Sequence, residues 1–279
     1  MLPNLVIIGA MKSGTTSLHS YLDLHPQISM SSVKELNFFI LEFNWSRGVQ
    51  WYESNFTDKT KILGESSTNY TMCHIFDGVP ESMYSVLPEA KLIYILRDPV
   101  DRIVSHYTHD YRIGKEKRSI SKALADLENN HYVSCHYVSC SKYYMQLEQY
   151  LNYFPQSNIL IITLEDLSRH RHRTLQKVFK FLEVDDSFYD QGFAKVLHKS
   201  SDKRRKNPIG VLLSRIPGKN LVKPFLPPHF RKVYESLYYN KVKKPTLSER
   251  SKQELIDHLQ DDINSLRKYT GSDFKDWCL

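Results

Sequence analysis

A lysine flanked by glycines near the start of the chain has the features of a phosphate-binding loop. In the sequence IIGAMKSGTTS, Lys12 stands between Gly9 and Gly14, after an apolar run and before an amphipathic stretch. Glycine lets the backbone approach a ligand closely, so that backbone N–H groups and the N-terminus of the next helix can face a phosphate. The alternative is a tight turn with no ligand. We expect a phosphate-binding loop made by Lys12, Ser13, Gly14, Thr15, Thr16 and Ser17.

The position of the lysine argues against a nucleoside triphosphatase. In a Walker A loop the lysine directly follows the second glycine, whereas here Thr15 follows Gly14 and Lys12 precedes that glycine. No later aspartate stands out as the second magnesium contact of such an enzyme. A nucleotide kinase stays as an alternative, because it also carries a Gly-rich loop after its first strand.

A second pair of candidate phosphate ligands follows another apolar run. In RDPVDRIVS, Arg97 and Ser105 lie on either side of a predicted strand-to-helix junction. A guanidinium fork and a hydroxyl suit a phosphate dianion. The alternative is that Arg97 only pairs with Asp98 or Asp101 and that Ser105 is a solvated helix residue.

The elements that position these loops are predicted from the apolar pattern. Buried strands are expected at Leu5–Ala10, Lys61–Gly64, Leu92–Leu96 and Asn158–Thr163. Helices are expected at Thr16–His25, Arg102–Arg112, Ile120–Asn129, Lys142–Phe154, Thr174–Leu182 and Ser248–Tyr269. Strands that alternate with helices predict an α/β fold with a P-loop-type parallel sheet flanked by helices on both faces. We expect one domain over residues 1–279.

Composition narrows the class of protein. With 279 residues and 41% hydrophobic content the chain can bury a full core. A formal charge of +7 suits an anionic ligand but is modest for a nucleic-acid binder, so we expect no nucleic-acid partner. The four cysteines form no CxxC pair and no histidine stands at zinc-ligand spacing, which predicts neither disulfides nor a metal. The apolar start is too short to cross a bilayer, so we expect a cytoplasmic protein with no membrane partner.

Two stretches interrupt the strand and helix pattern. Residues 131–140 are HYVSC written twice, and the lack of a helical period predicts a loop. Residues 199–245 are rich in proline, lysine and arginine, and predict an extended basic loop followed by a short helix at Pro228–Tyr239. We expect both stretches to lie over the site and to set acceptor specificity.

Three motifs together resemble a known family. PNLVIIGAMKSGTTSLHSYLDLHPQI, KELNFF and KLIYILRDPVDRIVSHY are similar, in order and spacing, to sulfotransferases of the heparan-sulfate type. These enzymes use 3′-phosphoadenosine-5′-phosphosulfate (PAPS) as donor and release 3′-phosphoadenosine-5′-phosphate (PAP), without a metal. The resemblance implies transfer of a sulfuryl group by in-line displacement to a hydroxyl, or an amine, of a small molecule, as in a soluble bacterial enzyme of secondary metabolism.

Two other interpretations stay open beside this one. A glycan O-sulfotransferase fits the same motifs. A basic polyanion-binding protein would use the Lys203–Lys206 and Lys241–Lys244 clusters instead.

The resemblance also implies roles for single residues. Lys12 would contact the bridging and sulfuryl oxygens and stabilise the leaving phosphate, while Arg97 and Ser105 would bind the 3′-phosphate. Glu35 in KELNFF would be the general base, a role that burial favours because it raises a carboxyl pKa. Competing bases are Glu65, His106 and His109.

Further positions are less defined. A late basic loop covers the nucleotide in this family, which indicates Lys203, Arg204 and Arg205 as donor contacts. Tyr143 matches a tyrosine near the adenine, although core packing is equally expected. One departure concerns charge: relatives carry EKTPSY where this chain has GESSTNY, so Ser66 stands in place of a lysine, and Lys34 is a candidate substitute.

Overall fold

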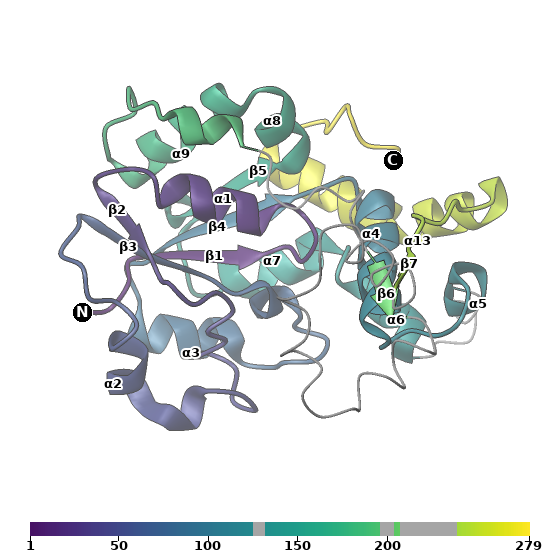
Figure 1. Ribbon diagram of the computed structural model, residues 1–279, viewed down its shortest axis with the longest axis horizontal. Helices are drawn as coiled ribbons and strands as arrows, with labels where there is room; N and C mark the ends of the chain where they lie inside the picture. Colours follow the sequence, from purple (N-terminus) through teal and green to yellow (C-terminus); the bar gives the residue numbers. More distant parts are fainter. Residues whose placement is uncertain (125–131, 196–203, 207–238) are drawn as a thin grey trace, which may run out of the picture.

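A five-stranded parallel sheet forms the centre of the protein. The computed structural model describes residues 1–124, 132–195, 204–206 and 239–279 (Figure 1). The strand order is β2-β3-β1-β4-β5, and every pair is parallel. The strands are β1 (Leu5–Gly9), β2 (Ile28–Met30), β3 (Ile62–Ser66), β4 (Lys91–Leu96) and β5 (Ile159–Thr163). This confirms the predicted fold class and the four predicted strands, whereas the short β2 was missed.

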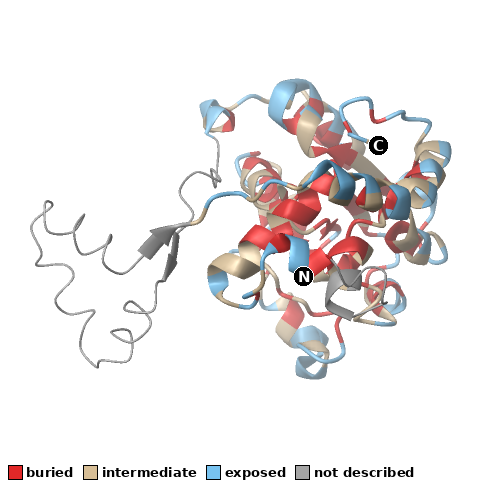
Figure 2. Cartoon of the chain, turned by 90° about the vertical axis from the view of Figure 1, so that its right-hand side faces the viewer, coloured by how far each residue is buried: buried red, intermediate tan, exposed pale blue. Residues whose placement is uncertain are grey.

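Helices cover both faces of the sheet because strand side chains alternate between the faces. Leu5 and Ile7 of β1 pack toward α1 (Thr15–Leu22), α8 (Leu164–Arg169) and α9 (Arg171–Leu182). Val6 and Ile8 pack into the opposite cluster, with α3 (Val79–Val86), α7 (Tyr143–Leu151) and α13 (Glu249–Thr270). Buried residues accordingly line the sheet and the inner helix faces (Figure 2).

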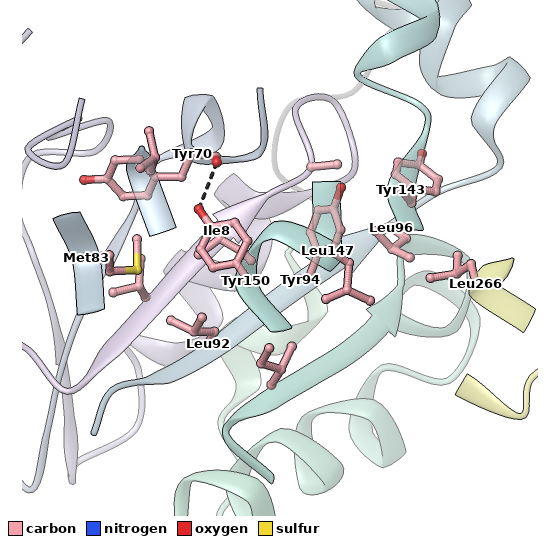
Figure 3. Close-up of a cluster of buried hydrophobic side chains, with 14 of the residues drawn as sticks. Ile8, Tyr70, Met83, Leu92, Tyr94, Leu96, Tyr143, Leu147, Tyr150 and Leu266 are labelled. Carbon is pink, nitrogen blue, oxygen red and sulfur yellow. Dashed lines mark hydrogen bonds between the residues drawn. The ribbon is translucent and has the colours of Figure 1, made fainter. Parts of the chain in front are cut away.

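Tyrosines provide polar contacts in the cluster that contains Val6 and Ile8. Figure 3 shows Tyr150 near Leu92, Tyr94 near Leu147 and Tyr143 near Leu96. The Tyr150 hydroxyl donates to the Tyr70 carbonyl oxygen at 2.8 Å. Most buried tyrosine hydroxyls find a hydrogen-bond partner, because leaving one unpaired costs free energy. The bond therefore attaches α7 to the segment that follows β3.

The remaining elements lie beside the sheet. They are α2 (Gly48–Glu53), α4 (Pro99–Ile113), α5 (Ile120–Leu124), α6 (Tyr132–Ser139) and the short 3-10 helices η1 (Trp45–Arg47), η2 (Thr68–Thr71), η4 (Gln156–Asn158) and η5 (Gln191–Ala194). Two further strands, β6 (Arg204–Lys206) and β7 (Tyr239–Lys241), pair antiparallel, and β6 lies beside α4 (Figure 1). The predicted helix at Pro228–Tyr239 falls outside the described residues, except that Tyr239 belongs to β7.

The prediction of a loop for the HYVSC repeat was wrong, because residues 132–139 form α6. Tyr137 and Val138 of the second copy are buried, and the Tyr137 ring meets the His106 ring of α4 edge-on at 4.9 Å. Arg102 of α4 also donates to the Tyr137 carbonyl oxygen. Tertiary contacts with α4 thus stabilise a helix that the local pattern did not indicate.

Candidate active site

The predicted phosphate loop lies between β1 and α1, at the carboxyl end of the central strand. Lys12 and Gly14 both have left-handed backbone, with φ of 72° and 93°. A Cβ atom on Gly14 would lie 2.7 Å from Leu164 Cδ1, and one on Gly9 would lie 2.1 Å from Thr71 Oγ1. Only glycine therefore fits at these two positions. The turn leaves the first amides of α1 facing the loop, as a phosphate requires.

The charge of Lys12 acts on α4, since it is among the causes that lower the pKa of His106. Burial, together with the positive charges of Arg102 and Lys12 among its neighbours, holds the pKa of His106 well below its usual value. Ser13 and Thr15 are buried, whereas Thr16 and Ser17 are half-buried. The loop thus offers one ammonium group and several hydroxyls near the start of α1.

Lys34 brings a second ammonium group to the loop. Its Nζ donates to Thr16 Oγ1 at 3.1 Å and to Thr15 Oγ1 at 3.4 Å, and its side chain is 22% exposed. Burial lowers the pKa of Lys34, while the neighbouring Glu35 carboxylate acts in the opposite direction. Lys34, which the sequence analysis gave as a candidate for the missing cation, therefore contacts the phosphate loop.

Glu35 is oriented by the first residue of η2. Its Oε2 accepts from the Thr68 backbone N–H at 2.7 Å and from the Thr68 hydroxyl at 3.2 Å, while Oε1 lies 3.6 Å from Lys34 Nζ. The backbone N–H of Glu35 donates to the Ser66 carbonyl oxygen at 2.9 Å. The side chain is 38% exposed, so burial is only partial and the carboxylate stays accessible at the mouth of the loop.

Glu65, a competing base, is a buried structural group. Its Oε1 accepts from the hydroxyls of Tyr52 at 2.7 Å and Tyr70 at 2.8 Å, and its Oε2 accepts from the Ser67 hydroxyl at 2.7 Å. Burial raises the pKa of Glu65 to about 7, against the opposing effect of these hydrogen bonds. Because its side chain is enclosed and satisfied, the geometry favours Glu35 over Glu65 as a base.

Ser66 occupies the strand end where relatives have lysine, and it pairs with His19. The Ser66 hydroxyl lies 2.8 Å from His19 Nδ1, and both side chains are buried. Burial, aided by the charge of Lys34, lowers the pKa of His19 to about 4, so the imidazole is neutral at neutral pH. Neither residue supplies the cation that the resemblance led us to expect at this point.

Arg97 and Ser105 lie on one face of the β4–α4 junction. Arg97 Nη2 lies 2.9 Å from Asp101 Oδ2, and Lys244 Nζ lies 2.7 Å from Asp101 Oδ1. Ser105 is one helical turn beyond Asp101 on α4 and is half-buried. The alternative partner that the sequence offered for Arg97, Asp101, is thus in contact with it. Because Asp101 is 48% exposed, a phosphate can compete with it for Arg97.

Arg102, which sequence reasoning did not select, links the two candidate phosphate sites. Its guanidinium is fully buried and donates to the Ser141 hydroxyl, to the Tyr137 carbonyl oxygen and, at 3.4 Å, to the Met11 carbonyl oxygen in the phosphate loop. In the structure Arg102 lies with Ile103 and His106 on the buried side of α4. A charged residue is rarely buried, so its residue type gave no reason to select it from the sequence.

The end of the described chain fixes the same junction. Asp98 caps α4 by accepting from the Asp101 N–H at 2.8 Å, and its other oxygen accepts from the Cys278 N–H at 2.6 Å. Trp277 Nε1 and the Asp98 N–H both donate to Glu165, at 3.3 and 3.2 Å. These contacts hold the backbone next to Arg97 in place.

The other predicted residues are not assembled into this group. Lys203 lies outside the described residues, and Arg204 and Arg205 are described only as backbone of β6. His106 is buried with its Nδ1 3.3 Å from Arg102 Nη1, and His109 lies one turn further along α4. Tyr143 is a core residue whose hydroxyl donates to the Arg97 carbonyl oxygen at 2.7 Å.

An open groove of about 870 Å³ runs along β5, elsewhere on the molecule. It is bordered by α9 and the end of α13, with Thr163, Lys177 and Phe274 among its lining residues. The candidate phosphate ligands of the β1–α1 loop and of the β4–α4 junction lie outside this groove.

In the part of the chain that the structure describes, we find no helix long and apolar enough to pass through a bilayer.

Comparison with known proteins gives one family. The family described as sulfotransferase domain matches residues 2–216. The chain is 34% identical over 191 residues to heparan sulfate glucosamine 3-O-sulfotransferase 5 of Mus musculus, a match that covers 66% of this chain and 54% of that protein. It is 30% identical over 207 residues to bifunctional heparan sulfate N-deacetylase/N-sulfotransferase 2 of Homo sapiens, covering 66% of this chain and 22% of that protein. The chain therefore matches only about a fifth to a half of these relatives.

Solved structures agree on the fold. A sulfotransferase from Alicyclobacillus acidocaldarius superposes with a TM-score of 0.72 at 22% identity and covers 99% of both chains. A mouse sulfotransferase complexed with PAP has a TM-score of 0.52 at 20% identity, covering 95% of this chain and 87% of that chain. At these identities the similarity establishes the shared architecture.

Proposed function

Because this chain belongs to the sulfotransferase domain family, we propose that it transfers a sulfuryl group from PAPS to an acceptor hydroxyl. The observation that carries the proposal is the placement of Lys34 and Glu35. One side chain contacts Thr16 at the start of α1 and the other lies 3.6 Å away on the open side. A cation for the donor and a carboxylate for the acceptor are thus adjacent.

The donor would bind across two neighbouring strands. We assign the 5′-phosphosulfate to the loop from Lys12 to Ser17 and the 3′-phosphate to Arg97 and Ser105. Since β1 and β4 are paired, their carboxyl ends present both groups at one edge of the sheet. The fold shared with a mouse sulfotransferase that was solved with PAP supports this donor.

The chemistry follows from these positions. The acceptor oxygen attacks sulfur in line with the bridging oxygen, the bond from sulfur to that oxygen breaks, and its electron pair stays on the phosphate of PAP. Glu35 takes the acceptor proton. The ammonium groups of Lys12 and Lys34 stabilise the negative charge that grows on the leaving phosphate. A positioned carboxylate serves an amine acceptor equally well.

For the acceptor we propose a small molecule, with a glycan as the second candidate. The glycan is favoured by one observation: the mouse and human relatives matched by sequence are named for heparan sulfate. The test incubates the protein with PAPS and either a metabolite extract or a set of unsulfated oligosaccharides, and uses mass spectrometry to detect an added sulfuryl group. The small-molecule proposal expects the new mass only in the metabolite extract, and sulfation confined to the oligosaccharides would overturn it.

A calorimetric titration separates a sulfotransferase from the other classes. PAP should bind in a 1:1 ratio and ATP should not. Binding of ATP but not PAP would indicate a nucleotide kinase. Binding of neither nucleotide, with binding of heparin, would indicate a polyanion-binding protein.

A further inference from the structure

Two histidines and a cysteine come together beside Arg102, outside the proposed donor site. His74 follows η2, while His136 and Cys140 come from α6 and the turn after it. His74 Nε2 lies 3.0 Å from His136 Nδ1, and Cys140 Sγ lies 3.8 Å from the former and 3.7 Å from the latter. His136 and Cys140 both belong to the second copy of the HYVSC repeat, whose role the proposed reaction leaves unexplained.

The triangle of ligand atoms has the size of a tetrahedral zinc site. With Zn–N near 2.0 Å and Zn–S near 2.3 Å, tetrahedral angles place ligand atoms about 3.3 Å apart for N to N and about 3.6 Å apart for N to S. The three separations in the protein, 3.0, 3.8 and 3.7 Å, each differ from these by a few tenths of an ångström. Small side-chain rotations are enough to close this difference.

Two of the three groups are already in the protonation state that binds a metal. Burial, aided by the nearby Arg102 charge, lowers the pKa of His74 to about 4. Burial, aided by the proximity of His74 and Arg102, likewise lowers the pKa of His136 to about 4. Both rings are therefore neutral at neutral pH, which is the form that binds metals. Burial raises the pKa of the Cys140 thiol to about 11, so its thiolate forms only when a metal displaces the proton. Arg102 opposes a dication, and the thiolate formed on binding offsets one unit of that charge.

We propose that His74 Nε2, His136 Nδ1 and Cys140 Sγ bind one Zn²⁺ ion, with water as the fourth ligand. Cys140 releases its thiol proton to solvent when the Zn–S bond forms. The ion would join the segment after η2 to the end of α6, next to the guanidinium that reaches the phosphate loop. The metal-free protein expected from the sequence rested on the lack of ligands at compact spacing, whereas these ligands lie on segments 62 residues apart.

Gln146 of α7 contacts both His74 and the backbone next to it. The Cys73 N–H donates to Gln146 Oε1 at 2.8 Å, so the amide nitrogen faces His74 Nδ1 at 3.3 Å. In this arrangement His74 carries its proton on Nε2 and donates it to His136. Zinc needs the Nε2 lone pair, which moves the proton to Nδ1 and leaves the Gln146 amide nitrogen as a mismatched partner. A carboxylate at position 146 would accept that proton and strengthen the site, although it would give up the hydrogen bond that the Gln146 amide nitrogen donates to the Ser139 carbonyl oxygen at 3.2 Å.

Cobalt is the probe for the test. The purified full chain is stripped with a chelator and titrated with Co²⁺, followed by Zn²⁺ in competition. We expect one Co²⁺ per chain with a thiolate-to-cobalt charge-transfer band and the d–d absorption of a four-coordinate ion. Cys140→Ser should abolish the charge-transfer band, and His74→Ala should weaken binding at least tenfold. Cys278→Ser is the matched control because this thiol lies outside the cluster, and it should change neither.

Gln146→Glu distinguishes a metal site from a hydrogen-bonded cluster. Zinc affinity should rise about tenfold in this variant if His74 Nε2 is a ligand. Melting curves of the metal-free proteins show whether each variant is folded, and affinities are compared among folded variants. The proposal is overturned if no stoichiometric Co²⁺ binds, if the spectrum lacks a thiolate band, or if Gln146→Glu leaves the affinity unchanged.

Discussion

The hydroxyl of Ser66 lies 2.8 Å from Nδ1 of His19, with both side chains buried, at the strand end where the resemblance to sulfotransferases of the heparan-sulfate type led us to expect a lysine. The pair is neutral at neutral pH, because burial holds the His19 pKa near 4. The second cation of the donor site must therefore come from another element. Lys34, which contacts Thr16 at 3.1 Å, is the group in position.

Lys34→Ala should lower kcat by about 10²- to 10³-fold, the usual effect of removing one group that stabilises transition-state charge. The measurement is the steady-state rate at saturating PAPS with the acceptor found by mass spectrometry. Lys59→Ala removes an exposed lysine and should leave the rate unchanged. A Lys34→Ala rate within twofold of the parent would return the second-cation role to an unidentified group.

Glu35→Gln should lower kcat by about 100-fold or more while leaving PAP affinity intact, because a general base acts on the acceptor and not on the nucleotide. Glutamine keeps the acceptor oxygen for the Thr68 N–H, so the local fold is retained. Rates and calorimetric PAP affinities are measured on the same preparation. Full activity in Glu35→Gln would exclude this carboxylate as the base.

Arg97→Ala should weaken PAP binding by about 10- to 100-fold, since charge-assisted hydrogen bonds to a phosphate dianion are lost. Calorimetric titration with PAP gives the dissociation constant directly. Arg250 on α13 is an exposed arginine, and its replacement by alanine should not alter the constant. Unchanged affinity in Arg97→Ala would mean that its pairing with Asp101 is its whole role.

Glu65 should make the free energy of unfolding depend on pH. Its pKa is about 7 in the folded protein and near 4.5 in an unfolded chain. The folded state therefore holds the proton more tightly, and stability falls as pH rises from about 4.5 to about 7, then levels off. The loss contributed by this group is about 3 kcal/mol.

Glu65→Gln, which imitates the protonated acid, should flatten this part of the profile. Urea unfolding of parent and variant at pH 5, 6, 7 and 8 measures the difference between them. The histidines contribute equally to both proteins, so their effects cancel in that difference. This includes His19, whose lowered pKa makes the free energy of unfolding decrease as the pH drops below about 6.5. A difference that stays constant over the pH range would show that Glu65 is ionised throughout.

The sequence predicted the parts of the molecule whose cause is local. The apolar runs and the Lys12 loop each follow from adjacent residues, and the four long strands and their α/β arrangement were confirmed. Contacts between distant segments were not accessible. Arg102 meets Met11 and Tyr137, α6 is stabilised by packing on α4, and His74 meets Cys140 only in the folded chain. Local periodicity does not indicate such contacts, because they depend on two segments that are distant in the sequence and meet only in the folded chain.

The central position of β1 sets an order for folding during synthesis. Leu5 pairs with Gly64 of β3 and Lys91 of β4, so both neighbours of the first strand are made after it. The Ala10 N–H, at the start of the phosphate loop, donates to the Ile95 carbonyl oxygen at 2.7 Å. The loop can take its shape only once β4 has left the ribosome, and parallel pairing of such distant segments is slow. Newly made chains must wait for that strand before they can hold a nucleotide.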